Sequence, residues 1–296
     1  MIAIVILNFN NSKDTIECLE SLKLLKNTNF KVFIGDNSTL INEYKMLKSY
    51  IENDNYINKI TNLYRIKKNN GFGSGNNYIM KKIDNNIYNN ILLLNNDTII
   101  KSVNLLCELE NKVNLINNDK YIIGCKLLNF DESFQESRGY YPGIINEILY
   151  SLKIKRNKEK YDYLSGAFLF FNSALIKEID GFDEKFFLYF EEVDFIYRAK
   201  SIGYKLYYFP EVEVIHKGGK STGNLNEFTV KNYLESMNYF LKKNFNYKYK
   251  LYLLYIIRNL IYILSIISIK ATSKKNFETR LRWCKLNLKF RKLLLK

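Results

Sequence analysis

The segment that most constrains the fold is I-L-L-L-N-N-D-T, at residues 91–98. Four consecutive apolar residues are typical of a β-strand that is buried on both faces. The run then stops at Asn95, Asn96 and Asp97, small polar residues that favour a turn. Since an open α/β sheet places its ligand site at the carboxyl ends of such strands, the segment predicts a binding edge.

Asp97 has two interpretations from this segment alone. Its carboxylate oxygens are hard ligands of the kind that Mg²⁺ and Mn²⁺ prefer, which makes Asp97 a candidate metal ligand. It could equally cap a helix that we expect to begin near Lys101. The segment does not decide between these two roles.

The first hundred residues alternate between strand and helix patterns. Short apolar runs predict strands at 3–7, 31–34, 63–66 and 91–94. Apolar residues three or four apart predict helices at 12–25, 44–51 and 77–83. This alternation indicates an α/β fold with an open, mostly parallel sheet and helices on both faces. Asn, Asp and Gly at the strand ends would gather polar groups along one edge.

The second half of the chain is less regular. We expect strands at 121–128, 163–171, 205–209 and 213–216, a loop at 135–143, and helices at 173–179 and within 186–203. The last two strands lie on either side of Pro210.

A glycine-rich segment, N-G-F-G-S-G-N-N at 70–77, follows the third strand. Glycines at alternate positions let backbone N–H groups approach a diphosphate. The dinucleotide fingerprint fails because position 76 is Asn, and the Lys-Ser/Thr ending of a P-loop is absent. Asn70, Gly71 and Asn76 are therefore candidate phosphate contacts, with a plain tight turn as the alternative.

Asp36 and Phe9 each follow a predicted strand. A carboxylate at Asp36 could accept the ring N–H of uracil or thymine, or a ribose hydroxyl, and Phe9 could stack on the base. The alternatives are a turn-forming Asp and a core Phe, and for Phe9 alone the core role is favoured.

Three acids, Glu191, Glu192 and Asp194, follow the aromatic run F-F-L-Y-F at 186–190. Mutual repulsion and partial desolvation both raise the pKa of a carboxylate toward the range of a general base. The alternative is a solvated helix start, where the helix dipole favours acids. The aromatic flank favours the functional interpretation.

His216 is the only histidine in the chain. A lone histidine is usually structural. Here, however, it ends a predicted strand and precedes the basic, glycine-rich segment K-G-G-K-S-T at 217–222. That position suits a metal ligand or a diphosphate contact.

Six motifs, taken together and in order, resemble the family 2 inverting glycosyltransferases with a GT-A fold, and among them the rhamnosyltransferase-like subgroup. They are V-I-L-N-F-N-N at 5–11, G-D-N-S at 35–38, N-N-G-F-G-S-G-N-N at 69–77, L-L-L-N-N-D-T at 92–98, G-F-D-E-K-F-F-L-Y-F-E-E-V-D-F at 181–195 and H-K-G-G-K-S-T at 216–222. The match spans residues 1 to about 225. We therefore expect a catalytic domain at 1–225 and a helical, membrane-associating extension at 226–296.

The resemblance implies transfer of a sugar, with rhamnose as one candidate, from a UDP or dTDP donor. The acceptor would be a hydroxyl of a glycan or a lipid-linked glycan in surface polysaccharide synthesis. It assigns Mg²⁺ or Mn²⁺ to Asp97 and His216, with Asn95 in place of the first acid of the D-x-D motif. By the same resemblance, Phe9, Asn10 and Asp36 would frame the base and ribose.

The resemblance also implies the base of the reaction. Glu192 falls where the family has its catalytic base, but the family pattern E-D-x-D is E-E-V-D here, so Glu191 is an alternative. Asp194 would contact the acceptor. The base would take the proton of the acceptor hydroxyl while that oxygen attacks the anomeric carbon, without a covalent intermediate.

The net charge of +15 is concentrated at the carboxyl end of the chain. Residues 242–296 hold 15 Lys and Arg and one acid, Glu278, so the remaining residues are nearly neutral. Residues 251–269 are mostly apolar, but Arg258 in their middle would cost about 2.5–3.5 kcal/mol in a membrane span. We therefore expect a helix that lies at the membrane interface or packs on the catalytic domain.

A basic stripe follows that apolar segment. Lys and Arg recur at three- and four-residue spacing, at Arg282, Lys285, Lys289, Lys292 and Lys296. We expect this stripe to bind an anionic membrane surface on the cytoplasmic side. Four scattered cysteines and an apolar, strand-like amino terminus fit a reducing cytoplasm and argue against a signal peptide.

Two rival functions follow from the same features. A sugar nucleotidyltransferase also needs a sugar nucleotide and a metal ion, but it would release pyrophosphate. A basic nucleic-acid-binding protein would show salt-sensitive binding to DNA or RNA. We expect no nucleic-acid partner, because the positive charge is confined to an apolar-rich tail.

Overall fold

The structure is a computed structural model and describes residues 1–26, 29–143, 160–218 and 226–245, with the single positions 146, 149, 260, 281, 285 and 289. Its elements are β1 (Ile2–Asn8), α1 (Ser12–Leu22), β2 (Phe30–Asp36), α2 (Ile41–Asn53), α3 (Asn55–Ile60), β3 (Thr61–Arg65), α4 (Phe72–Met80), β4 (Asn90–Asn95), β5 (Thr98–Ile100), α5 (Leu105–Ile116), β6 (Tyr121–Leu128), β7 (Phe134–Gln135), β8 (Arg138–Gly139), β9 (Tyr163–Leu164), β10 (Phe168–Asn172), α7 (Ala174–Ile179), α8 (Glu191–Ser201), β11 (Lys205–His216) and α9 (Glu227–Phe245).

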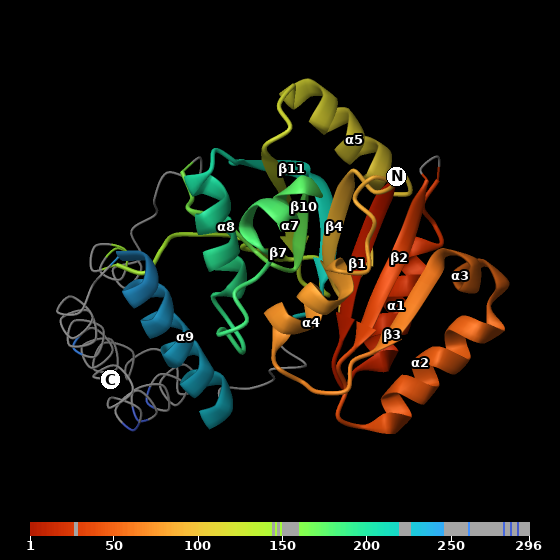
Figure 1. Cartoon of the computed structure of the whole chain (residues 1–296), viewed down its shortest axis with the longest axis horizontal. Helices are drawn as coiled ribbons and strands as arrows, with labels where there is room; N and C mark the ends of the chain where they lie inside the picture. The colour runs from red at the N-terminus through yellow and green to blue at the C-terminus, as the bar shows by residue number, and fades with distance from the viewer. Residues whose placement is uncertain are drawn as a thin grey trace.

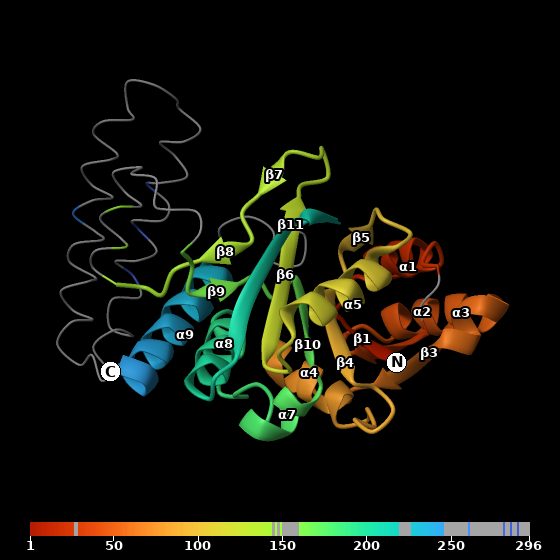
Figure 2. The same ribbon diagram turned by 90° about the horizontal axis from the view of Figure 1, so that it is seen from above.

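The described strands form one large mixed sheet and a separate two-stranded antiparallel sheet (Figures 1 and 2). The large sheet has the order β3-β2-β1-β4-β10-β6-β11-β5, with β7 beside β6, and β8 pairs with β9. The strands β3, β2, β1 and β4 run parallel to one another, and β6 runs parallel to β11. Only β10, among the central strands, is antiparallel to both of its neighbours. The open, mostly parallel α/β sheet expected from the sequence is confirmed.

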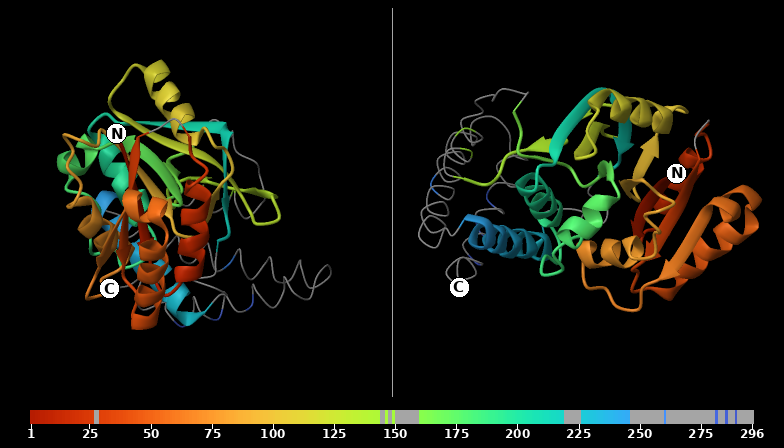
Figure 3. Two further views of the ribbon diagram at one scale, coloured as in Figure 1. Left: turned by 90° about the vertical axis from the view of Figure 1, so that its right-hand side faces the viewer. Right: turned by 45° about the horizontal axis from the view of Figure 1, so that its top comes forward.

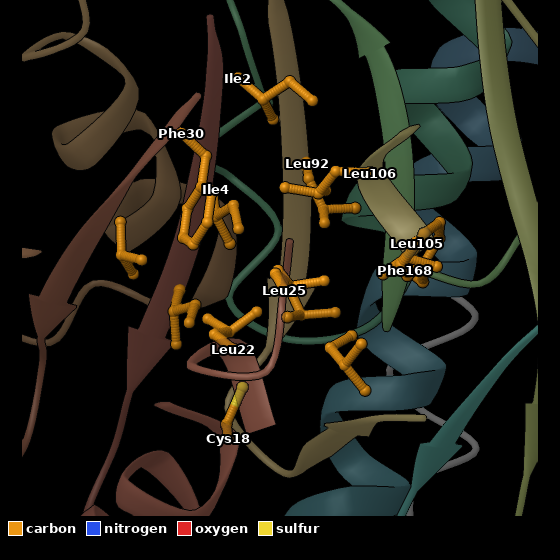
Figure 4. Close-up of a cluster of buried hydrophobic side chains, with 14 of the residues drawn as sticks. Ile2, Ile4, Cys18, Leu22, Leu25, Phe30, Leu92, Leu105, Leu106 and Phe168 are labelled. Carbon is orange, nitrogen blue, oxygen red and sulfur yellow. The ribbon is translucent and has the colours of Figure 1, made fainter. Parts of the chain in front are cut away.

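The central strands are buried on both faces because their alternate side chains enter two different cores. On one face, Ile2, Ile4 and Leu92 pack with Leu22 of α1 and with the first turn of α5 (Figure 4). On the other face, the intervening residues of β1 and β4 pack with helices α4, α7 and α8. The sheet is thus covered by helices on both of its faces.

A third apolar cluster joins α8 to α9 at the end of the sheet. Phe186, Phe190 and Val193 pack there against Leu234, Phe240 and other residues of α9. Figures 2 and 3 show α9 beside α8 and away from the sheet. The helix that carries Glu191 and Glu192 is therefore covered by the first helix of the predicted extension.

Four local predictions were wrong in detail. Asp97 does not cap a helix, because β5 follows it directly and α5 begins only at Leu105. Helix α4 begins at Phe72, inside the glycine-rich segment, and not at Asn77. The loop expected at 135–143 contains parts of β7 and β8. The two strands around Pro210 are one strand, β11, with an irregularity between Phe209 and Glu213.

The prediction of an apolar helix at 251–269 lies outside the described residues, except for Leu260. In the part of the chain that is described, no helix is both long and apolar enough to cross a membrane. Of the basic stripe, only Lys285 and Lys289 are described, and Lys289 forms an ion pair of 2.6 Å with Glu227 of α9.

Candidate active site

The carboxyl end of β4 and the end of β11 bring Asp97 and His216 together. Strand β5 pairs with β11 so that Thr98 lies opposite His216, and Asp97 is the residue before Thr98. His216 Nε2 lies 3.3 Å from Asp97 Oδ1 and 3.3 Å from Asn95 Nδ2. His216 Nδ1 lies 2.7 Å from Gln135 Oε1, which can only accept, so Nδ1 carries a proton. In the neutral ring Nε2 then has the lone pair, which can accept from Asn95 Nδ2 or bind a cation.

This donor set fits a divalent ion. One carboxylate and one imidazole nitrogen suit Mn²⁺ or Mg²⁺ when further oxygens complete the coordination, as those of a diphosphate would. Within the described residues no group of three or more His, Cys, Asp or Glu could hold a metal by itself.

The ends of β1 and β2 form a polar cluster next to this pair. Asp36 is fully buried, and its Oδ1 accepts from Asn8 Nδ2 at 2.7 Å and from Ser38 Oγ at 2.6 Å. Its other oxygen forms an ion pair with Arg65. Asn10 holds the same corner, because its Oδ1 accepts from the Thr39 N–H at 3.0 Å.

Phe9 lies beside this corner and is half-buried. It belongs to none of the three apolar clusters of the described residues, so it is not a core side chain. The core role favoured for Phe9 from the sequence was wrong.

The glycine-rich segment forms the start of α4. Gly71 precedes the helix with φ of +104°, and a Cβ there would lie 2.2 Å from the carbonyl oxygen of Phe187. That same oxygen accepts the N–H of Phe72 at 3.0 Å. Asn70 is exposed, whereas Asn76 is fully buried and its Oδ1 has no partner. The amino terminus of α4 thus lies against the segment that precedes α8.

Glu191 and Glu192 begin α8 behind two residues, Tyr189 and Phe190, that both have positive φ. Such a conformation is strained for aromatic residues, and strain of this kind clusters at functional sites. Burial raises the pKa of Glu191 well above its ordinary value, and the charge of Glu192 raises it further. Burial also raises the pKa of Glu192. One oxygen of each carboxyl group is buried without a partner.

Contacts through Gly166 and Ala167, the two residues before β10, connect Glu192 to the Asp97–His216 pair. The N–H of Asn95 donates to the carbonyl of Ala167 at 3.0 Å. The preceding residue, Gly166, lies so close to Glu192 that a Cβ there would be 3.2 Å from Glu192 Cβ. On the other side of α8, a Cβ at Gly73 would be 3.7 Å from Glu191 Cβ. The start of α4, the start of α8 and the end of β4 therefore meet in one region.

Asp194 lies elsewhere. Its side chain is fully buried, and its oxygens are bound by Arg198 at 2.7 Å, by Lys243 at 2.8 Å and by Asn244 at 3.1 Å. Lys243 and Asn244 belong to α9. A contact with an acceptor would require Asp194 to release these partners, so its present contacts hold α9 against α8.

The sequence of the chain is similar to that of known rhamnosyltransferases. It is 26% identical to the rhamnosyltransferase WbbL of Escherichia coli K12 over 217 residues, which is 66% of this chain and 77% of that protein. It is 32% identical to an N-acetylglucosaminyl-diphospho-decaprenol L-rhamnosyltransferase of Mycobacterium tuberculosis, but over only 71 residues and 23% of that protein. The chain matches no protein-family profile.

The fold agrees with these relatives. A mannosyltransferase from Pyrobaculum calidifontis, solved with GDP-Man and Mn²⁺, superposes with a TM-score of 0.65 at 10% identity, over 98% of this chain and 86% of that chain. The GT-A fold is thus shared at very low identity. The chain is a rhamnosyltransferase-like glycosyltransferase. GalNAc-T7, solved with UDP, GalNAc and Mn²⁺, superposes with a TM-score of 0.61 at 14% identity, over 82% of this chain and 51% of that chain.

Sequence reasoning missed three residues around the candidate site of this glycosyltransferase. Arg65 binds Asp36, and Lys217 binds Asp14 at 2.6 Å and also pairs with Glu17 of α1. Gln135 binds His216. Only Lys217 had a sequence signal, since it belongs to the H-K-G-G motif. In the structure its side chain is 5% exposed, and its charge is neutralised by Asp14 and Glu17.

Proposed function

We propose that this glycosyltransferase transfers a sugar from a nucleoside diphosphate to a hydroxyl group with inversion at the anomeric carbon. The observation that carries the proposal is the contact path from Asp97 through Asn95, Ala167 and Gly166 to Glu192. It supports a cleft with cation-binding groups on one side and a carboxyl group of raised pKa on the other. Those are the two functions that such a transfer needs.

Asp97 and His216 are the proposed ligands of the divalent ion, with Mn²⁺ or Mg²⁺ as the candidates. When bound, this ion would neutralise the charge that develops on the leaving diphosphate. The solved mannosyltransferase and GalNAc-T7 each contain Mn²⁺ with a nucleotide or nucleotide sugar, which favours Mn²⁺. Asn95 replaces the first acid of the D-x-D motif as a neutral side chain.

The donor occupies the edge formed by β1, β2 and the start of α4 in this proposal. Phe9, Asn10 and Asp36 frame the base and ribose, with Asp36 held in place by Arg65. Asn70, Gly71 and Asn76 line the diphosphate side, where the amino terminus of α4 favours negative charge. UDP and dTDP are the candidate carriers, and rhamnose is the candidate sugar because both curated relatives are rhamnosyltransferases.

Glu192 is the proposed general base. It is less buried than Glu191, which is 5% exposed, so an acceptor hydroxyl reaches Glu192 more easily. Glu192 accepts the hydroxyl proton while the acceptor oxygen forms its bond to the anomeric carbon and the bond to the diphosphate breaks. Glu191 stays beside it as a buried acid whose own pKa is raised by burial and by the charge of Glu192.

The acceptor in this proposal is a lipid-linked glycan at the cytoplasmic face of the cell membrane. The mycobacterial relative is named for a decaprenol-linked acceptor, and the basic, apolar-rich residues 226–296 would bring this chain to an anionic surface. Residues 1–225 then form the catalytic domain and the rest an extension that begins with α9.

Two substitutions test the proposal directly. Asp97→Asn and Glu192→Gln should each reduce transfer at least about 100-fold, because each removes one chemical function while keeping the side-chain volume. Glu191→Gln is the matched control and should retain most activity. Transfer by both variants at the rate of the unsubstituted enzyme would overturn the site assignment.

Product analysis separates this function from nucleotidyl transfer. A glycosyltransferase releases a nucleoside diphosphate, and a nucleotidyltransferase releases pyrophosphate. Incubation with dTDP- and UDP-sugars and an isoprenoid-diphosphate acceptor should therefore produce free dTDP or UDP and no pyrophosphate.

A further inference from the structure

Gln135 lies directly behind the proposed metal ligand His216. The two-residue strand β7 pairs with β6 so that Gln135 is opposite Leu127, and β6 in turn pairs with β11, which ends at His216. This arrangement places Gln135 Oε1 2.7 Å from His216 Nδ1. It also places Gln135 Nε2 3.4 Å from the carbonyl oxygen of His216. One side chain thus contacts both the ring and the backbone of the histidine.

A chain of hydrogen bonds fixes which end of the Gln135 amide faces the ring. Ser133 Oγ donates its proton to Asp131 at 2.5 Å and therefore accepts from Asn129 Nδ2, which is 2.9 Å away. With its NH₂ group used in this way, Asn129 presents Oδ1 to Gln135 Nε2 at 2.9 Å. Gln135 must then turn its carbonyl oxygen, a pure acceptor, toward His216.

The consequence is a defined imidazole tautomer. The proton on Nδ1 is used by Gln135, so in the neutral ring the lone pair is on Nε2, 3.3 Å from Asp97 Oδ1. We propose that Gln135, oriented by Asn129 and Ser133, is a positioning residue that presents His216 Nε2 to the divalent ion. This inference depends on the metal site of the proposed function and assigns a role to residues outside all six sequence motifs.

Loss of this contact has a predictable cost. Hydrogen-bond partners behind metal-binding histidines typically contribute about 10–100-fold to metal affinity, because they fix the tautomer and the ring orientation. Gln135→Met keeps the length of the side chain but cannot accept the Nδ1 proton. Gln135→Glu retains an acceptor oxygen and should restore most of the affinity.

The first experiment measures Mn²⁺ binding to the full chain in the presence of UDP by electron paramagnetic resonance. Gln135→Met should bind Mn²⁺ roughly 10–100-fold more weakly, and Gln135→Glu should differ from the unsubstituted chain by less than about 5-fold. Glu136→Gln is the matched control, because this neighbouring exposed residue pairs with Arg138 and not with His216. UDP binding without metal should be the same in all four proteins.

The two possible failures are distinguishable. If Mn²⁺ binding requires Asp97 and His216 but is unchanged in Gln135→Met, the role of Gln135 is wrong and the proposed function stands. If Asp97→Asn and His216→Ala bind Mn²⁺ as well as the unsubstituted chain, the metal site itself is wrong and the inference is overturned with it.

A second measurement reads the tautomer without using affinity or activity. Because His216 is the only histidine, labelling histidine with ¹⁵N gives the signals of a single imidazole in the full chain. In the full chain without metal, the proton of the neutral ring should be on Nδ1, and Gln135→Met should lose this preference. A proton on Nε2 in the unsubstituted chain would contradict the inference even if the substituted chain does not fold.

Discussion

The ionisation of Glu191 is coupled to folding. Its carboxyl group is 5% exposed, and burial followed by the charge of Glu192 raises its pKa well above its ordinary value of 4.5. A group with a raised pKa holds more protons in the folded than in the unfolded state. Its contribution to stability is therefore complete below pH 4.5 and is lost as pH rises through the folded pKa.

Glu191→Gln should remove the loss of folding stability that occurs as pH rises. The variant should be more stable than the unsubstituted chain at pH 8, because Gln stays neutral, and the difference should vanish as pH falls toward 4. Urea unfolding monitored by circular dichroism across this pH range measures the effect. The exposed Glu52→Gln is the control and should leave the pH dependence unchanged. Equal pH dependence in the Glu191 variant would show that the group titrates normally.

Gly71 shapes the site through its backbone conformation and its close approach to Phe187. Gly71→Ala should lower the free energy of unfolding by at least about 1 kcal/mol, because φ is +104° and the new Cβ would contact the backbone of Phe187. Displacing that contact should also weaken nucleotide binding. Gly143→Ala is the control, since nothing lies within 4 Å of a Cβ there. Chemical unfolding and UDP titration of both variants make the comparison, and equal results for the two would refute the prediction.

At the scale of elements, the link between α8 and α9 depends on a buried charge cluster. Lys243 of α9 lies 2.8 Å from Asp183 and 2.8 Å from the fully buried Asp194 of α8. Removal of one partner from such a cluster leaves a buried carboxylate less well compensated. The first turn of α8 carries Glu191 and Glu192, so this link connects the extension to the proposed base.

Lys243→Met should therefore lower the free energy of unfolding by about 1–3 kcal/mol, with Arg198 still bound to Asp194. The transfer rate should fall as well, because α8 is less firmly held. Lys231→Met, on the exposed side of the same helix, should change stability by less than about 0.5 kcal/mol. Urea unfolding and transfer assays test both variants. The prediction is wrong if the two variants lose the same amount of stability.

The parts of the fold that could be predicted are those with a local cause. Strand β6 has the predicted bounds of Tyr121 and Leu128, because an apolar run interrupted only by Gly124 and Lys126 specifies a largely buried strand. The close approach of Asp97 and His216 was also expected, but from a resemblance between ordered motifs and not from spacing. Roles for individual site residues remain predictions.

The parts that could not be predicted depend on contacts between distant segments. Gln135 lies in a stretch with no periodicity, and its partner is 81 residues away, so nothing near it in the sequence marks it. Asp194 looked like a member of an acidic site, but Lys243 and Asn244 reach it from a helix 49 and 50 residues away. Spacing within one segment cannot reveal which charges a later helix will neutralise.

At the scale of the whole molecule, the uneven charge is the main feature left to explain. The 15 basic residues at 242–296 account for almost all of the net charge of +15. A nearly neutral catalytic body with a basic, apolar-rich end is the distribution expected of a chain that docks on an anionic surface. A lipid-linked acceptor would then be confined to the same surface as the enzyme.

Replacement of the five residues of the basic stripe with Gln should weaken binding to vesicles that contain phosphatidylglycerol. At roughly 1 kcal/mol for each basic group near the surface, the loss at low salt should exceed about 100-fold. The control replaces five exposed lysines of the catalytic body, Lys13, Lys45, Lys48, Lys67 and Lys68, and removes the same charge elsewhere. Cosedimentation with phosphatidylglycerol and with neutral phosphatidylcholine vesicles measures both. The two variants lose the same charge and differ only in where it is lost, so equal losses of binding would mean that net charge alone attracts the chain. Unchanged binding of the stripe variant would instead assign the attachment to apolar contacts.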